Sequence, residues 1–121
     1  MKKMRKTTCS LVTGGAGFLG SHVVDELVSM GHKVIVIDDL SGGFKKNINN
    51  NAIFIKGSVA NRKIVTEIFN KYKISYVYHL AAYAAEGLSH FIRGFNYENN
   101  LIGSINLINE SVKNDIKRFI F

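Results

Sequence analysis

A glycine-rich segment at residues 13–20, with the sequence TGGAGFLG, constrains the fold of this chain more than any other feature. It follows an apolar run that has the length of a buried strand, and it leads into a segment with apolar residues at helical spacing. A G-x-G-x-x-G pattern between a strand and a helix is typical of a turn that receives a dinucleotide pyrophosphate. Glycine-rich turns also occur for steric reasons alone, so this interpretation needs an independent second feature.

The glycines of this segment have separate expected roles. Gly14 or Gly15 permits the tight turn out of the strand, and Gly17 removes a side chain where a pyrophosphate approaches the backbone. Gly20 lets the following helix pack close to the sheet. The N–H groups of the first helical turn then face the phosphates, and the helix dipole favours their negative charge.

Asp38 is the second feature, and it follows a predicted β-branched strand at residues 33–37. It stands eighteen residues after Gly20, near the spacing of an acid that binds the hydroxyls of adenosine ribose. A carboxylate accepts two hydrogen bonds from a 2′,3′-diol and repels a 2′-phosphate, so the pattern favours NAD over NADP. An isolated aspartate is more often a turn or cap residue, but the strand, the spacing and the glycine segment together favour cofactor binding.

Short apolar runs alternate with amphipathic segments along the whole chain. Strands are predicted at residues 9–13, 33–37, 52–56, 76–80 and 118–121, and helices at residues 18–30, 62–72 and 97–114. This alternation predicts βαβ units, and hence a Rossmann-type doubly wound parallel sheet of the α/β class. Because the last apolar strand runs into Phe121, we expect the sheet to be truncated within its fifth strand. We assign a basic N-terminal arm to residues 1–8 and an incomplete NAD-binding domain to residues 9–121.

Composition excludes several classes of protein. The chain has 121 residues, 46% of them hydrophobic, which suits one domain with a buried core. No apolar run reaches the roughly 18–20 residues of a membrane span, and none follows the basic start as in a secretory signal. We therefore expect a cytoplasmic protein without a membrane partner.

The net charge of +7 is weak evidence for nucleic acid binding. Lys2, Lys3, Arg5 and Lys6 supply four of these charges, and the other 115 residues together carry +3. A short basic arm before a nearly balanced domain is typical of a solvated tail. We therefore expect no nucleic acid partner.

Histidine and cysteine show no pattern of a metal or nucleophile site. The four histidines lack metal-ligand spacing, so we expect no metal, and His22 and His79 are expected to pack against neighbours. Cys9 is the single cysteine, which excludes an internal disulfide, and we expect it to be buried in the first strand without a base partner.

Four segments together resemble the extended short-chain dehydrogenase/reductase family, and within it the nucleotide-sugar epimerase/dehydratase group. They are TGGAGFLGSH at residues 13–22, VIDDLSG at 36–42, HLAA at 79–82 and NNLIGSINL at 99–107. They follow the order of the family over nearly the whole chain, and the UDP-glucose 4-epimerases are the nearest branch.

The resemblance implies NAD as the cofactor and a set of contacts with it. These are the backbone of Phe18 and Leu19 at the pyrophosphate, Asp38 at the ribose, Asp39, Leu40 and Ser41 beside the adenosine, Leu80, Ala81 and Ala82 along the cofactor, and Asn100, or Asn99, near the fourth strand. The family carries an acid that contacts the adenine amino group after the third strand. Here Ser58 takes that position, and its hydroxyl makes a weaker contact.

The resemblance also implies the reaction of a complete enzyme. It would be an NAD-dependent nucleotide-sugar 4-epimerase that oxidises C4 transiently, returns the hydride and forms a homodimer. The family's catalytic Ser/Thr and Tyr-x-x-x-Lys follow the fifth strand, and none of the five tyrosines here precedes a lysine by four residues. We therefore expect those catalytic groups to lie beyond Phe121 and the 121-residue chain itself to be inactive.

Two alternatives stay open. A nucleotide-sugar dehydratase or decarboxylase shares the same cofactor half, and a non-catalytic dinucleotide-binding module would need nothing more. Tyr83, Glu86, Ser89 and His90 follow the fourth strand, where the substrate side of the family begins, but an exposed loop is the commoner interpretation of such residues. Turnover of a nucleotide sugar would separate an enzyme from a binding module.

Overall fold

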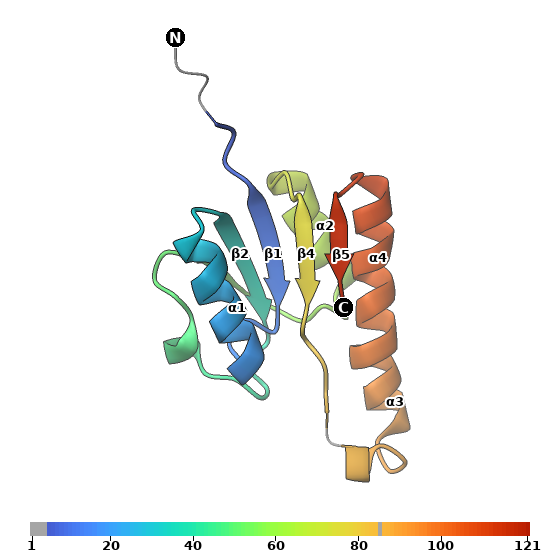
Figure 1. The fold of residues 1–121 in the computed structure, drawn as a ribbon. Coiled ribbons are helices and arrows are strands. Elements are labelled where there is room, and N and C mark those ends of the chain that lie inside the picture. The colour runs from blue at the N-terminus through green and yellow to red at the C-terminus, as the bar shows by residue number, and fades with distance from the viewer. Residues whose placement is uncertain (1–4, 85) are drawn as a thin grey trace.

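The computed structural model describes residues 5–84 and 86–121, and it contains a five-stranded parallel sheet with the order β3-β2-β1-β4-β5 (Figure 1). The strands are β1 (Cys9–Thr13), β2 (Lys33–Asp38), β3 (Ile53–Lys56), β4 (Tyr76–His79) and β5 (Arg118–Ile120). The helices are α1 (Phe18–Ser29), α2 (Arg62–Lys71), α3 (Arg93–Asn96) and α4 (Gly103–Lys113), with a π-helical segment η3 (Tyr97–Ile102) between the last two. Single 3₁₀ turns η1 (Lys45–Asn47) and η2 (Glu86–Leu88) interrupt two loops. This order confirms the Rossmann-type fold, in which β5 is the last strand and ends one residue before the end of the sequence. Lys2 and Lys3 of the predicted arm lie outside the described residues.

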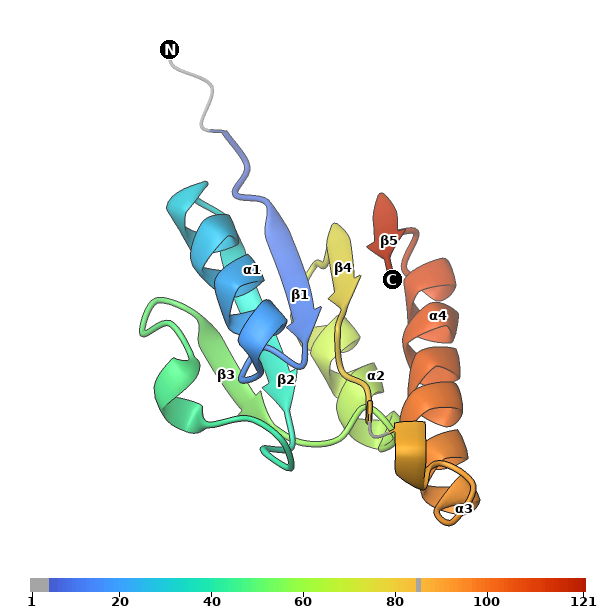
Figure 2. The same ribbon diagram turned by 60° about the horizontal axis from the view of Figure 1, so that its bottom comes forward.

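Both faces of the central strands are buried, which explains their almost unbroken apolar sequence. On one face, Val12 of β1 packs with Val24 and Leu27 of α1. On the other face, Leu11 packs in the larger cluster that α2 and α4 cover, together with Leu107. Figures 1 and 2 show α1 on one side of the sheet and the other two helices on the opposite side.

The helix predicted at residues 97–114 differs from its prediction at its start. It begins at α3, four residues before the predicted start, and it contains one π-helical stretch. Of its apolar side chains, Leu107 is fully buried, while a stripe on the other face is exposed: Leu101, Ile102, Ile105, Ile108 and Val112. The buried face also carries polar side chains, and one of them, the Asn106 side-chain amide, donates to the carbonyls of Val59 and Ala60 at 2.9 and 3.3 Å.

The connections from β1 and β4 leave the sheet on opposite faces. The chain after β1 enters α1, and the chain after β4 leads to the helices on the other face (Figure 2). In sheets of this kind ligands bind at such a reversal, at the carboxyl ends of the strands. The glycine segment and the residues after His79 meet at this point. None of the described helices is long and apolar enough to cross a membrane.

Candidate functional site

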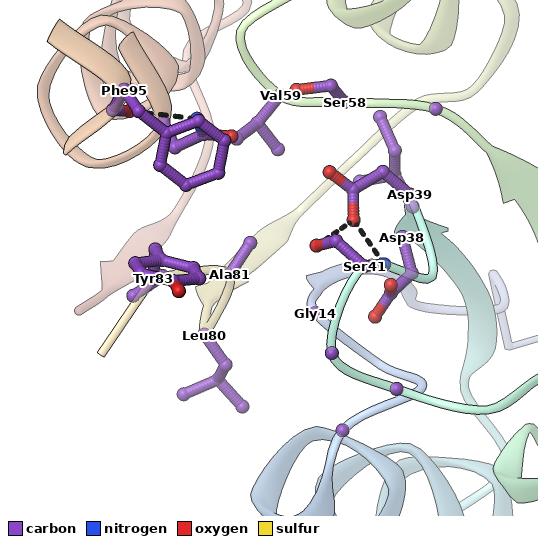
Figure 3. A pocket seen from close by; sticks show the side chains of 17 residues that line it. Gly14, Asp38, Asp39, Ser41, Ser58, Val59, Leu80, Ala81, Tyr83 and Phe95 are labelled. Atoms are coloured by element: carbon purple, nitrogen blue, oxygen red, sulfur yellow. Dashed lines mark hydrogen bonds between the residues drawn. The ribbon is translucent and has the colours of Figure 1, made fainter. Parts of the chain in front are cut away.

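A pocket opens at the carboxyl ends of the strands, where the chain reverses between β1 and β4. Nine of the predicted cofactor residues line it: Gly14, Gly17, Asp38, Asp39, Ser41, Ser58, Leu80, Ala81 and Ala82. In Figure 3, Asp39 and Ser41 stand on one side of the pocket, and Tyr83 and Phe95 stand on the other. Residues far apart in sequence therefore meet at one place, as the motif spacing predicts.

The turn after β1 depends on three of its glycines for different reasons. Gly14 has φ 72°, in the left-handed region, and a Cβ there would lie 2.8 Å from the Ala81 amide nitrogen. Gly14 is therefore the residue that makes the tight turn. A Cβ on Gly20 would overlap the Gly14 carbonyl, which explains how closely α1 approaches the turn. A Cβ on Gly17 would meet only the Gly14 carbonyl oxygen, at 3.3 Å, so this position leaves the pocket open.

The peptide groups of Ala16, inside the glycine turn, are held by the last residue of β2 and by the loop that follows it. The Ala16 amide donates to Asp38 Oδ2 at 2.9 Å. The Ala16 carbonyl accepts from the Phe44 amide at 3.2 Å and from Asn47 Nδ2 at 3.1 Å. These bonds fix the turn in one conformation, and the sequence contains no motif that predicts the contributions of Phe44 and Asn47.

Each oxygen of the Asp38 carboxylate accepts one hydrogen bond from the backbone. Besides Ala16, the carboxylate accepts from the Leu40 amide at 2.7 Å through Oδ1. Leu40 has φ 64°, a conformation that costs a non-glycine residue roughly 1–2 kcal/mol. Each carboxylate oxygen has two lone pairs, so Asp38 is still able to accept hydrogen bonds from a diol in the pocket. Leu40 itself does not line the pocket.

Two short loops complete the side of the pocket that was predicted for adenosine. Asp39 Oδ1 accepts from the Ser41 amide at 2.9 Å and from its hydroxyl at 2.6 Å, as the dashed lines in Figure 3 mark. Ser58 Oγ accepts from the Ala60 amide at 3.1 Å, which leaves the hydroxyl hydrogen to be donated elsewhere. Both serines therefore present polar groups that local bonds hold in place.

The opposite side of the pocket is formed by two aromatic rings. The rings of Tyr83 and Phe95 meet edge to face, with centroids 4.9 Å apart. Phe95 lies in α3, ahead of the predicted helix start, and no motif marks it. For Tyr83 an exposed loop was the commoner interpretation and the substrate side the alternative, but it lines the same pocket as Asp38.

Asn99 and Asn100 have different positions on that side of the pocket. Asn100 lies outside the lining of the pocket, because its amide is used on the Tyr83 backbone: Oδ1 accepts from the Tyr83 amide at 2.8 Å and Nδ2 donates to the Tyr83 carbonyl at 3.0 Å. Asn99 lines the pocket instead. A cofactor contact by Asn100 stays a prediction.

The lining of the pocket also excludes Phe18, Leu19, Ser89 and His90. The side chains of Phe18 and Leu19 are 79% and 67% exposed, which agrees with a role for their backbone groups alone. These residues start α1, where N–H groups have no partner within the helix. Ser89 and His90 do not line the pocket, and Glu86 begins η2.

The histidines and Cys9 divide between the surface and the core. His22 is exposed and packs against the edge of the Phe18 ring, with ring centroids 5.1 Å apart, so its neighbour lies at the surface and not in the core. His79 is buried, and desolvation lowers its pKa. Cys9 is buried as predicted, and desolvation raises the pKa of its thiol, which Lys33 partly opposes. No group of three or more metal-ligating side chains occurs among the residues that the structure describes.

Comparison with known proteins identifies relatives over nearly the whole chain. Residues 10–121 match the model of the NAD dependent epimerase/dehydratase family. The chain is 38% identical to the bifunctional protein GAL10 of Candida maltosa, over 92% of this chain and 78% of that protein. It is 35% identical to the UDP-glucose 4-epimerase of Erwinia amylovora over the same share of this chain. The chain spans only 35% of the Erwinia protein and 17% of the GAL10 protein of Kluyveromyces lactis.

Solved structures show the same arrangement. The UDP-glucose 4-epimerase of Thermotoga maritima with UDP-glucose superposes with a TM-score of 0.92 at 44% identity, over 94% of this chain and 37% of that chain. The Thermus thermophilus UDP-glucose 4-epimerase in complex with NAD gives a TM-score of 0.89 at 32% identity, over the same shares of the two chains.

Proposed function

The chain belongs to the NAD dependent epimerase/dehydratase family, and we propose that it is the NAD-binding portion of a nucleotide-sugar 4-epimerase of the UDP-glucose/UDP-galactose type. One observation carries this proposal. The glycine turn after β1 and the acid at the end of β2 are hydrogen-bonded to each other and line one pocket at the reversal of the sheet. The relatives named UDP-glucose 4-epimerase support the choice of reaction.

The residues of the pocket fit NAD. Gly17 leaves space beside the first turn of α1, where N–H groups and the helix dipole suit a pyrophosphate. Asp38 has the acceptor capacity for the two ribose hydroxyls, and its charge repels the 2′-phosphate of NADP. Ser58 also lines the pocket, and its hydroxyl is the group proposed to contact the adenine.

In the complete enzyme, bound NAD would supply a hydride acceptor that oxidises the sugar at C4 and then returns the hydride. The residues described here bind and orient: Asp38 holds one end of the pocket, and the Tyr83–Phe95 pair forms an aromatic wall at the other. Proton exchange with the sugar hydroxyl is assigned to the family's Tyr-x-x-x-Lys, which we expect beyond Phe121. The 121-residue chain alone is therefore expected to show no turnover. We expect the enzyme to work in the cytoplasm.

The exposed apolar face that runs from η3 into α4 supports the proposal of a homodimer. Leu101, Ile105, Ile108 and Val112 are separated by three or four residues, so they form one stripe on the helix, and each is more than 40% exposed. An apolar stripe of this kind is typical of a protein–protein contact. Sedimentation of the full-length protein and of its Ile105→Glu variant tests the proposal. The full-length protein should be a dimer, and the variant should be a monomer. A monomeric full-length protein would contradict it.

The experiment for the reaction starts from the transcript. Its reading frame is determined past the codon of Phe121, and the encoded protein is assayed with UDP-galactose and NAD. The proposal expects a downstream Ser/Thr and Tyr-x-x-x-Lys, and formation of UDP-glucose. A stop codon directly after Phe121 would leave a dinucleotide-binding module. Loss of water from the nucleotide hexose would identify a dehydratase, and release of carbon dioxide from a nucleotide-linked sugar acid, assayed separately, would identify a decarboxylase.

A further inference from the structure

His79 is a buried side chain that joins three elements next to the pocket. It ends β4, directly before Leu80, and is only 6% exposed. Its Nδ1 lies 2.7 Å from Thr13 Oγ1 at the end of β1, and its Nε2 lies 2.8 Å from Ser104 Oγ in α4. The imidazole therefore connects both strands that flank the ligand crevice with the helix behind them.

The bonds of Thr13 decide the direction of the first contact. Thr13 Oγ1 accepts from the Leu80 amide at 3.1 Å and from the Ala81 amide at 3.0 Å. A hydroxyl oxygen has two lone pairs and one hydrogen. Because the two amides use the lone pairs, the hydroxyl hydrogen is directed to His79 Nδ1, and this ring nitrogen is an acceptor.

The bonds of Ser104 decide the direction of the second contact. Its hydroxyl donates to the Asn100 carbonyl at 2.5 Å, so the Ser104 oxygen is left to accept from His79 Nε2. The ring is then neutral, with its hydrogen on Nε2. Its surroundings favour the neutral form, since the rings of Phe119 and Phe121 lie 6.1 and 5.5 Å from it and desolvation lowers its pKa.

We propose that His79, as the neutral Nε2–H tautomer, is a positioning residue for the cofactor pocket. Its Nδ1 orients the Thr13 hydroxyl, whose oxygen holds the Ala81 amide against the glycine turn. The Leu80 amide also reaches the Thr13 carbonyl, at 3.2 Å, so Ala81 is the amide that depends most on the hydroxyl. Gly14 packs so closely on Ala81 that a shift of this strand end changes the lining of the pocket. The inference rests on the proposed function, because its consequence is measured as NAD affinity.

Two substitutions at position 79 separate positioning from simple packing. In His79→Asn, the side-chain oxygen reaches the place of Nδ1 and is able to accept from Thr13, but the contact with Ser104 is lost. In His79→Gln, the longer side chain fills more of the site and reaches toward Ser104, but the acceptor for Thr13 is lost. Titration calorimetry with NAD should give a dissociation constant about tenfold higher for the Gln variant, as expected for one lost hydrogen bond, and a smaller change for the Asn variant. A purely structural role predicts the reverse order, because Asn leaves the larger cavity.

Variants of Thr13 test the same link from the other side. Thr13→Val keeps the shape of the side chain but leaves Ala81 without the hydroxyl, so it should weaken NAD binding as much as His79→Gln. Thr13→Ser keeps the hydroxyl and should bind NAD within about threefold of the unaltered chain. Equal affinities for the Val and Ser variants would overturn the proposal.

Nitrogen NMR of the imidazole tests the tautomer without any cofactor. In the ¹⁵N-labelled 121-residue chain at pH 7, the His79 signals, assigned by their loss in His79→Asn, should show hydrogen on Nε2 alone. A hydrogen on Nδ1 would overturn the proposal. If the unaltered chain fails to bind NAD, the proposed function and the positioning role fail together. If the chain binds NAD but His79→Asn binds NAD more weakly than His79→Gln, only the positioning role fails.

Discussion

Asp38 Oδ2 accepts a hydrogen bond from the Ala16 amide at 2.9 Å, so the acid that ends β2 also holds the glycine turn that follows β1. The two residues are 22 positions apart in sequence. One carboxylate thus shapes the turn that is proposed for the pyrophosphate and offers acceptors for the ribose. Substitutions at Asp38 are therefore expected to affect both parts of the pocket at once.

Asp38→Asn should weaken NAD binding by about ten- to a hundredfold, as expected when a charge-assisted hydrogen bond is lost. Affinity for NADP should fall less, because the repulsion of the 2′-phosphate is removed as well. Titration calorimetry with both cofactors measures the two changes. Asp25→Asn is the matched control, since this exposed carboxylate on α1 bonds to Asn49 away from the pocket lining. Equal losses in the two variants would contradict the role of Asp38.

Gly20→Ala should destabilise the chain by about 1–3 kcal/mol, the range of overpacked sites, because its methyl group would overlap the Gly14 carbonyl. Gly94→Ala is the matched control. It lies in α3 with nothing within 4 Å of the added carbon, and alanine favours a helix. Thermal unfolding should show a lower midpoint for Gly20→Ala but not for Gly94→Ala. If Gly20→Ala unfolds at the same temperature as the unaltered chain, the close packing of α1 is contradicted.

The stability of the chain should fall as the pH decreases below about 6.5, the ordinary pKa of histidine. Burial lowers the pKa of His79 in the folded state, so between the two pKa values the unfolded state binds the proton and the folded state does not. Urea unfolding at a series of pH values measures this loss. The His79→Asn variant lacks the titrating group, and its free energy of unfolding should decrease less over the same pH range. Parallel profiles for the two proteins would count against a buried neutral His79.

Cys9 should resist alkylation in the folded chain. Its side chain is buried in β1, and desolvation raises the pKa of the thiol, so little thiolate is exposed to the reagent. Mass spectrometry after iodoacetamide treatment should find slow modification in buffer and rapid modification in denaturing urea. Similar rates in both conditions would mean that the first strand opens readily.

The strands and the pocket were predictable because short-range patterns determine them. The β-branched run of β2 and the glycine segment place one side of the pocket, and the spacing to Asp38 places the acid. The buried face of α4 was not predictable from apolar spacing. Its burial is decided by hydrogen bonds to distant partners, such as the bond from Thr66 Oγ1 to Glu110 Oε1 at 3.1 Å.

Long-range polar contacts escaped the sequence analysis for the same reason. Asn47 bonds to Ala16 from 31 residues away. His79 bonds to Thr13 and Ser104, which are 66 and 25 residues away in sequence. Neither periodicity nor a motif marks such pairs, because each depends on how the loops close over the sheet. Phe95 was missed because it lies ahead of the apolar spacing that indicated the helix.

Titration of the unaltered 121-residue chain with NAD and NADP tests the central claim most directly. Asp38 lines the pocket beside the glycine turn, so saturable binding of NAD is expected, at a lower dissociation constant than that for NADP. Absence of NAD binding by the folded chain, or tighter binding of NADP, would contradict the account.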